Sequence, residues 1–347
     1  MLEFEPGSGA LKCGFCGTLN EIPKSDHGIA ELDYEQQLEE LKSQQPVHEA
    51  TVIHCDGCGG ESTLPDGQSS GLCPFCGRAV VATSIVRKQI KPKALLPFAI
   101  QQQGAKQRFD QWLGSLWFAP SGLKKFADAG GLGGVYLPAW TFDCHVLSDY
   151  TGRRGDHYYD TESYTAMVNG KSMRQTRQVR RTRWSGASGS VQNAFDDLLV
   201  LADRSLPPDL RSAMQDWDLP ALVPYQDDYL SGFVTETYQV ELQDGFETAK
   251  QMMDPQIRAT VRADIGGDEQ QISSLESVYR AITFKHILVP VWISAYRYKD
   301  KTFRFAINGR TGTVFGQRPW SAWKIVSLVA VILLAILIIV GIVAAAQ

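Results

Sequence analysis

The hydrophobic pattern is most extreme near the C-terminal end of the chain. Residues 325–346 contain no charged side chain, and only Gln347 follows them. A helix rises about 1.5 Å per residue, so this segment is about 33 Å long, enough to cross a hydrocarbon core of about 30 Å. No polar face interrupts the segment, as it would in an interfacial helix. The pattern therefore predicts one transmembrane helix.

Helical spacing recurs upstream of this segment. Leu32, Leu38 and Leu41 mark a polar helix within 29–45 that we interpret as a spacer. Asp254 and Pro255 have the residue types of an N-cap and a first helical position, which predicts a new helix after them. The other predicted helices cover 98–118, 121–129 and 244–253, and the helix after Pro255 is predicted to end at Gly266 and Gly267.

Strand patterns occupy much of the remaining chain. Residues 158–184 predict a hairpin that turns at Asn169 and Gly170. The other strand regions are 135–150, 232–242 and 284–314, the last as three strands. Residues 130–134 and 185–190 are predicted loops. The predicted class is α+β, with N-terminal zinc ribbons, a mixed β-rich body with several helices, and one C-terminal transmembrane helix.

Two strand regions share a short motif. Residues 136–142 read aliphatic-Pro-x-Trp around Pro138 and Trp140, and residues 288–294 do so around Pro290 and Trp292. This similarity raises the hypothesis of an internal duplication. Proline lacks a backbone N–H, so each motif is expected at a strand start or a sheet edge.

Six of the seven cysteines form three C-x-x-C pairs. The pairs Cys55/Cys58 and Cys73/Cys76 are separated by 14 residues, enough for a hairpin that sets two tight turns side by side. Four thiolates with no spare position make a closed tetrahedral Zn²⁺ site, which is structural. A glycine follows each pair and allows backbone amides to point at sulfur.

The remaining cysteines are harder to place. Cys13 and Cys16 form a third turn of the same kind without a partner pair, and no histidine lies at a standard spacing from them. Cys144 stands alone in a strand pattern, and its neighbour His145 points to the opposite face. We therefore interpret Cys144 as a core residue.

Catalytic motifs are absent from the sequence. It has no phosphate loop, no H-E-x-x-H and no G-x-S-x-G. The formal charge of −4 also excludes a chain that binds nucleic acid through overall positive charge. We expect a protein that is not an enzyme and has no small-molecule substrate.

One segment departs from this charge balance. Residues 151–185 carry eight basic residues against three acidic ones. Three interpretations remain open: a solvated strand face with cross-strand salt bridges, contact with anionic lipid headgroups, or contact with nucleic acid. The candidate residues for an anionic partner are Arg153, Arg154, Arg174, Arg177, Arg180, Arg181 and Arg183.

As a set, several motifs resemble bacterial zinc-ribbon, membrane-anchored proteins often labelled primosomal protein N′ (replication factor Y) or superfamily II helicase-like. The motifs include the runs at 2–17, 136–143, 180–184, 264–270 and 308–312. In that family a further C-x-x-C-G turn precedes the Leu-Glu-Phe run. The resemblance therefore implies that Met1 is an internal methionine and that Cys13 and Cys16 are half of a second site. Helicase activity is not supported, because the phosphate loop is missing.

The flanks of the apolar segment predict its orientation. Arg310, Arg318 and Lys324 precede the segment, no charge follows it, and basic flanks stay on the cytoplasmic side. Reduced C-x-x-C pairs also fit the cytoplasm. Trp320 and Trp323 lie where an interfacial aromatic belt would be. The predicted location is the cell membrane, with a single pass and a cytoplasmic body.

Together these patterns predict five regions: 1–28 (half a zinc ribbon, N-terminally truncated), 29–50 (spacer), 51–90 (zinc ribbon), 91–318 (body) and 319–347 (anchor). The predicted function is a non-enzymatic adaptor that recruits protein partners to the membrane. The resemblance implies a stress or membrane-remodelling role beside phage-shock-protein-A-like and flotillin-like proteins. The alternative is a membrane-associated nucleic-acid-binding protein related to replication.

Overall fold

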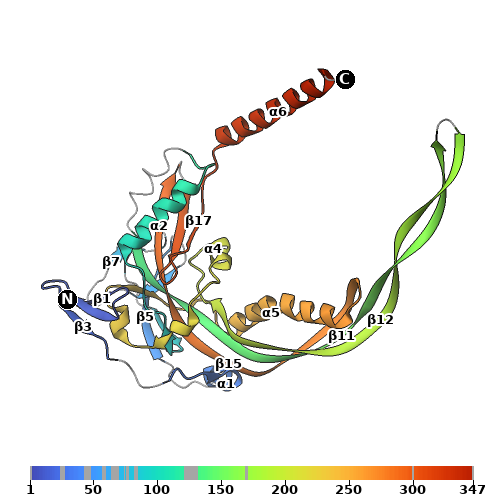
Figure 1. Ribbon diagram of the computed structural model, residues 1–347. Helices are drawn as coiled ribbons and strands as arrows, with labels where there is room; N and C mark the ends of the chain where they lie inside the picture. The colour runs from blue at the N-terminus through green and yellow to red at the C-terminus, as the bar shows by residue number, and fades with distance from the viewer. Residues whose placement is uncertain are drawn as a thin grey trace.

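The computed structural model describes residues 2–23, 28–42, 48–56, 60–63, 70–73, 75, 78–81, 85–120, 132–168, 171–298 and 301–345. Within these ranges the chain is a mixed α+β protein, rich in strands, with one apolar C-terminal helix projecting from the body (Figure 1). The predicted α+β class is confirmed. The helix predicted over 121–129 lies outside the described residues.

The described part of the chain contains helices and strands of very different lengths. Its helices are α1 (Tyr34–Lys42), α2 (Gln102–Ser115), α4 (Pro208–Ala213), α5 (Leu242–Ile265) and α6 (Ala322–Ala345), with 3-10 turns η1 (Leu219–Ala221) and η2 (Asp227–Leu230). Its strands are β1 (Leu2–Glu5), β2 (Ala10–Cys13), β3 (Leu19–Glu21), β4 (Leu32–Asp33), β5 (His48–His54), β6 (Glu61–Thr63), β7 (Ser70–Leu72), β8 (Ala79–Val81), β9 (Ile85–Gln89), β10 (Ala94–Leu95), β11 (Gly133–Val168), β12 (Lys171–Leu201), β13 (Val223–Pro224), β14 (Val234–Glu236), β15 (Glu269–Tyr298), β16 (Lys301–Asn308) and β17 (Val314–Gly316).

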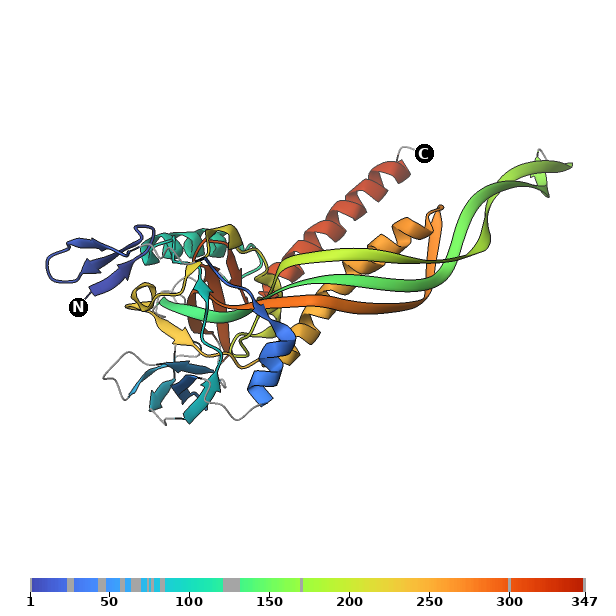
Figure 2. The same ribbon diagram turned by 90° about the horizontal axis from the view of Figure 1, so that it is seen from below.

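Three long strands organise the molecule. β11 lies between β12 and β15 and is antiparallel to both, while β16 and β17 extend the sheet on the far side of β15. α5 packs along one face of the long strands (Figure 1), where Val261 and Ile265 bury against Tyr150 and Val191. The N-terminal strands form a separate small sheet, β1–β2–β3 (Figure 2).

The two aliphatic-Pro-x-Trp motifs face each other across β11 and β15. Leu137 pairs with its equivalent Val289, and on either side of this pair Pro138 lies opposite Leu288 and Pro290 lies opposite Tyr136. Pro138 and Pro290 lie well inside their strands, which corrects the expectation of a strand start or edge. Their carbonyls accept hydrogen bonds from the backbone N–H groups of Ala202 (2.9 Å) and Gly309 (2.8 Å), so both prolines still contribute to the backbone network.

The tryptophans of these motifs make matching contacts. The Trp140 indole donates to the carbonyl of Val240, just before α5, and the Trp292 indole donates to the carbonyl of Ile100, just before α2, both at 2.9 Å. The short strands that precede the two helices also correspond, because β14 runs parallel to β11 and β10 runs parallel to β15. Each motif thus fixes the start of one helix onto the central sheet.

The helix start predicted at Pro255 is wrong. Pro255 lies inside the single helix α5 and does not begin a new one. The buried stripe of Met253, Ile257 and Val261 is continuous across it, so tertiary packing outweighs the cost of about 3 kcal/mol for an internal proline.

The predicted loop at 185–190 is strand in β12, paired with β11. A Cβ on Gly189 would lie 3.0 Å from Asp264 and Tyr150, so the glycine allows α5 to approach the strand closely. Gly133 and Gly134 likewise begin β11 and are not a linker, whereas the strand predicted over 232–242 shrinks to β14.

A pair of glycine substitutions tests the packing of the helices. In Gly245→Ala the new Cβ would lie 2.7 Å from Cδ1 of the buried Trp140, so we expect a loss of about 1–3 kcal/mol in unfolding free energy from overpacking. Gly114 in α2 has no neighbour within 4 Å of such an atom, and Gly114→Ala should add about 0.5–1 kcal/mol through helix propensity. Thermal unfolding of the full chain in detergent measures the stability of both variants. Equal melting temperatures of Gly245→Ala and Gly114→Ala would contradict the close packing of α5 against Trp140.

Candidate functional site

The three C-x-x-C turns share one backbone geometry. In each, the N–H of the first cysteine donates to the carbonyl five residues later: Cys13 to Thr18 (2.9 Å), Cys55 to Gly60 (2.9 Å) and Cys73 to Arg78 (2.7 Å). Each turn also connects two paired strands, β2 to β3, β5 to β6 and β7 to β8. This closure suits a metal knuckle, because it brings the chain back on itself just after the C-x-x-C sequence.

Two of the turns meet in the core. Cys55 and Cys73 are buried in one apolar cluster together with Phe75, packed against the central sheet. Their partners Cys58 and Cys76 lie outside the described residues. Among the residues that are described, no group of three or more His, Cys, Asp or Glu side chains gathers around one point. The fit to zinc therefore rests on the first cysteine of each pair and on the shared turn geometry.

The Cys13 turn differs because it is open to solvent. Cys16 is exposed, and its thiol lies 3.2 Å from the hydroxyl of Thr18. Hydrogen bonds from Thr18, and then from Cys13, lower the pKa of the Cys16 thiol to about 7. A thiol that ionises near neutral pH is suited to metal binding. Gly17 follows with φ +73°, a conformation that favours glycine.

Cys144 is a core residue, as predicted. Its sulfur lies 3.7 Å from the sulfur of Met253 beneath α5, and burial raises the pKa of its thiol to about 11. His145 lies on the exposed side of the same strand. The two side chains therefore do not form a nucleophile and base pair.

The predicted hairpin is confirmed, and it projects far beyond the body. β15 begins at Glu269, paired with Gly155, so within the described part of the chain no third strand lies beside residues 156–168 and 171–183. We call this two-stranded segment the ribbon (Figures 1 and 2). Directly paired residues share a face, so the ribbon has two faces of different composition.

On one face, which we call the ladder face, Asp160 and Glu162 of β11 form ion pairs with Arg177 and Arg181 of β12. Glu162 accepts from Arg181 (2.6 Å) and from Arg177 (3.3 Å) on the opposite strand, and Arg181 also lies 3.4 Å from Asp160. These hydrogen bonds, from Arg177 first, hold the pKa of Glu162 below its usual value. Arg183 stacks over Tyr158 at 5.1 Å from its ring centroid. The cross-strand salt bridges proposed from the sequence are thus present on this face.

The other face, the cationic face, has no carboxylate between residues 158 and 181. It carries Arg174 and Arg180, together with the exposed side chains of Tyr159 and Met167 and a set of Ser, Thr and Gln residues. The patch predicted from the sequence contains all seven arginines and includes neither Tyr159 nor Met167. Separating the residues by period-two alternation would have divided the arginines in the same way.

The remaining two arginines of the predicted patch lie at the base of the ribbon. Arg154 donates to Asp156 at 3.0 Å, and Arg153 lies over the ring of Trp184. They are therefore separate from the arginines farther out.

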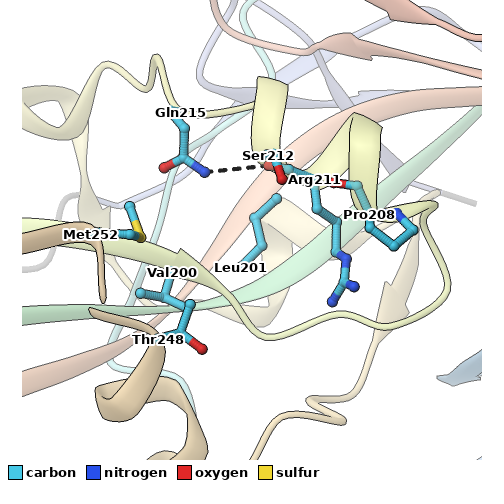
Figure 3. Close-up of a pocket in the computed structure, with 8 residues that line it drawn as sticks. All are labelled: Val200, Leu201, Pro208, Arg211, Ser212, Gln215, Thr248 and Met252. Atoms are coloured by element: carbon cyan, nitrogen blue, oxygen red, sulfur yellow. Dashed lines mark hydrogen bonds between the residues drawn. The ribbon is translucent and has the colours of Figure 1, made fainter. Parts of the chain in front are cut away.

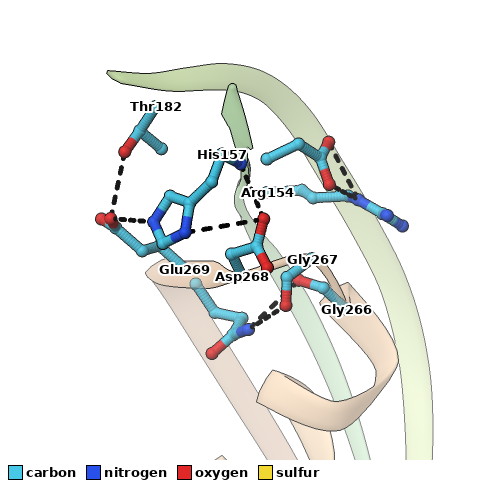
Figure 4. Close-up of polar contacts among 9 residues, drawn as sticks. Arg154, His157, Thr182, Gly266, Gly267, Asp268 and Glu269 are labelled. Carbon is cyan, nitrogen blue, oxygen red and sulfur yellow. Dashed lines mark hydrogen bonds and ion pairs between the residues drawn. The ribbon is translucent and has the colours of Figure 1, made fainter. Parts of the chain in front are cut away.

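Residues at the end of α5 and the start of β15 form polar contacts with this base (Figure 4). Asp268 donates its backbone N–H to Gly155 (2.8 Å), and its carboxylate accepts from the N–H of His157 (2.7 Å). The His157 ring and the Thr182 hydroxyl both contact Glu269, and the pKa of that carboxyl is lowered as a result, by His157 first. This network holds the ribbon in a defined direction relative to the body.

A buried charge cluster was not foreseen from the sequence. The ammonium of Lys285 lies 2.7 Å from Asp197, 3.0 Å from Glu31 and 3.7 Å from Asp143, at a bulge in β11. Burial opposes the charge on Lys285, but hydrogen bonds to Asp197 and Glu31 outweigh it and raise the pKa of the lysine. The cluster fastens the segment before α1 to the central sheet.

A shallow groove lies between α4, α5 and β12 (Figure 3). It has a volume of about 430 Å³, an apolar floor that includes Val200, Leu201 and Met252, and a rim with Arg211 and Gln215. The Arg211 guanidinium donates to the carbonyl of Asp203 at 2.7 Å. Its eight lining residues include no His, Cys, Asp, Glu or Lys, so this groove brings no acid and base pair together.

A short segment between β17 and α6, residues 317–321, joins the apolar helix to the body, and we call it the neck. The span Ala322–Ile342 in α6 contains an 18-residue window with a mean hydropathy of 3.4 and no buried residue, so α6 is long and apolar enough to cross a membrane. Lys324 donates to the carbonyls of Trp117 (3.0 Å) and Ala119 (2.8 Å), just after α2. Trp320 and Trp323 are exposed at the same level. The first turn of α6 thus holds the end of the neck against the body.

Comparisons with known proteins add one similarity. No family model matches the chain, and no solved structure matches it. The chain is similar to the uncharacterized protein YdjG of Bacillus subtilis (strain 168), at 23% identity over 254 residues that cover 72% of this chain and 70% of the relative. This similarity assigns no activity, so the resemblance to replication-factor-Y-like zinc-ribbon proteins stays a prediction.

Proposed function

We propose that this protein is a non-enzymatic platform, stabilised by structural zinc and anchored by α6 in the cell membrane with its body in the cytoplasm. The observation that carries the proposal is α6 itself, a long apolar helix with no buried residue in its span, joined to a folded body. Such a helix leaves apolar side chains in water unless a bilayer or a partner covers them. A single membrane anchor concentrates the body at a surface.

Zinc would be held by Cys55, Cys58, Cys73 and Cys76. The matched backbone closure of the turns and the shared burial of Cys55 and Cys73 support this assignment. Bound there, the ion supplies architecture and no reaction, because four thiolates leave no open coordination position. Cys13 and Cys16 would contribute two ligands of a second site.

The body offers surfaces to protein partners. Phe15 at the tip of the Cys13 turn is 91% exposed and Leu19 is 53% exposed, on a small sheet that projects from the body (Figure 2). Apolar side chains on a rigid turn are typical of protein contacts. The resemblance points to partners of the phage-shock-protein-A-like or flotillin-like kind.

Topology mapping tests the anchor. In cells, the full chain should resist carbonate extraction, and a variant that ends before Ala322 should be released. Protease added to inverted membrane vesicles should digest the body, whereas protease added to intact spheroplasts should leave it whole. Release of the full chain by carbonate, or digestion in spheroplasts, would contradict the proposed anchor or orientation.

A further inference from the structure

The two faces of the ribbon differ in charge, and this difference points to a partner. We propose that the cationic face, with Tyr159, Met167, Arg174 and Arg180, rests on anionic lipid headgroups of the bilayer that holds α6. The inference depends on the proposed membrane anchor and adds a second, reversible contact to it. It identifies what the exposed ribbon binds.

Charge complementarity favours this face over the ladder face. The ladder face places Asp160 and Glu162 against Arg177 and Arg181, so these two arginines are already paired with carboxylates. No salt bridge of Arg174 or Arg180 occurs among the described residues. Arg180 does contribute to the field at Glu269 near the base, and Arg174 lies farther out, opposite Thr165. The cationic face therefore has charge available for phosphate groups.

The uncharged residues of the cationic face suit a lipid surface as well. Tyr159 is 68% exposed and Met167 is 73% exposed, and both lie on this face. A tyrosine ring prefers the headgroup level, where its apolar body and its hydroxyl are both satisfied. Met173 is also exposed near the hairpin turn, so each face of the ribbon has one exposed methionine toward its outer end.

The position of the ribbon relative to α6 favours even a weak contact between the ribbon and the membrane. In both views of the molecule the ribbon and α6 leave the body toward the same side (Figures 1 and 2). Once α6 is inserted, the ribbon meets the membrane in an intramolecular step. An arginine near an anionic surface favours contact about fivefold, so two arginines favour it about 25-fold.

Photocrosslinking tests which face touches lipid. The full chain is reconstituted in nanodiscs of phosphatidylcholine alone or with phosphatidylglycerol, with p-benzoylphenylalanine replacing either Tyr159 or its neighbour Tyr158 on the ladder face. We expect lipid adducts at residue 159 in the anionic nanodiscs, at least fivefold above residue 158 and above neutral nanodiscs. Equal yields at the two positions, or equal yields in the two lipids, would overturn the proposal.

Charge variants of the Tyr159 probe separate a local effect from net charge. Arg174→Gln with Arg180→Gln should lower the adduct yield at residue 159 at least fivefold. Arg177→Gln with Arg181→Gln removes the same charge from the ladder face and should change the yield less than twofold. A similar loss in both variants would mean that only overall charge matters and would refute the assignment to this face.

Duplex DNA added to the anionic nanodiscs distinguishes the competing partner. Adducts that move from lipid to DNA at about 0.15 M salt would make nucleic acid the occupant and overturn the lipid contact. Lipid adducts that persist support it. Co-migration of the chain with the nanodiscs is recorded in every sample, so a failed anchor is recognised separately from a failed ribbon contact.

Discussion

The double substitution Cys55→Ser and Cys58→Ser is expected to remove one zinc equivalent and to unfold β5 to β9, while α6 still inserts. Structural zinc contributes about 10–16 kcal/mol of binding free energy in small zinc-finger peptides, more than any other single change considered for this chain. Because Cys55 and Cys73 share one buried cluster, loss of the proposed ion would leave the Cys73 thiolate uncompensated in the core. Metal analysis and limited proteolysis mapped by mass spectrometry measure the two effects.

Cys144→Ala is the matched control for this experiment. Cys144 is as buried as Cys55, at 3% exposure, but it packs against Met253 and not in a C-x-x-C turn. The control should keep its full zinc content and lose only about 1–2 kcal/mol from the small cavity. Zinc content that is the same in C55S/C58S and in the unaltered chain would show that these cysteines do not hold the metal.

Local signals predicted the elements that depend on local chemistry. Asn169 and Gly170 indicated the hairpin turn, and β11 and β12 indeed pair up to Val168 and Lys171 on either side of it. Gly266 was expected to end the preceding helix, and it does so with φ +64°. The apolar run at 325–346 identified α6. Each of these features follows from a few neighbouring residues.

Long-range packing decided the features that were missed. Pro255 signals a helix start in isolation, but the sheet beneath α5 buries residues on both sides of it. The small residues at 185–190 are typical of a loop, yet β11 supplies a full ladder of partners. Period-two alternation alone divides the arginines of β12 between two faces, but only the strand register shows which carboxylates of β11 lie beside them. No local pattern reports that Glu31 and Lys285, 254 residues apart, form an ion pair at the edge of the core.

Substitution of Lys285 is the second change for which we expect a large effect, in this case on the unfolding free energy. Lys285→Met should lower the unfolding free energy by about 3 kcal/mol at pH 7, because Asp143, Asp197 and Glu31 would remain together without their cation. The value lies at the low end for a broken buried ion pair, since Glu31 and Asp197 keep partial access to water. Lys12→Met breaks an exposed pair with Glu5 and should cost less than about 1 kcal/mol.

The pH dependence of this loss identifies its cause. Lys285, and then Thr283, lower the pKa of Glu31, so the stabilisation from Glu31 is complete above its ordinary value of 4.5 and is lost as the pH falls through the folded-state value. Burial raises the pKa of Asp143, so its folded form takes up a proton early, and acidification relieves the repulsion that remains in the variant. The two pKa shifts are opposite, but both make the difference in stability between Lys285→Met and the unaltered chain smaller as the pH falls. Melting curves of the full chain in detergent measure the difference in melting temperature between Lys285→Met and the unaltered chain. This difference should become smaller below about pH 4.5. A difference that stays constant down to pH 3 would assign the loss to packing of the lysine stem and not to its charge.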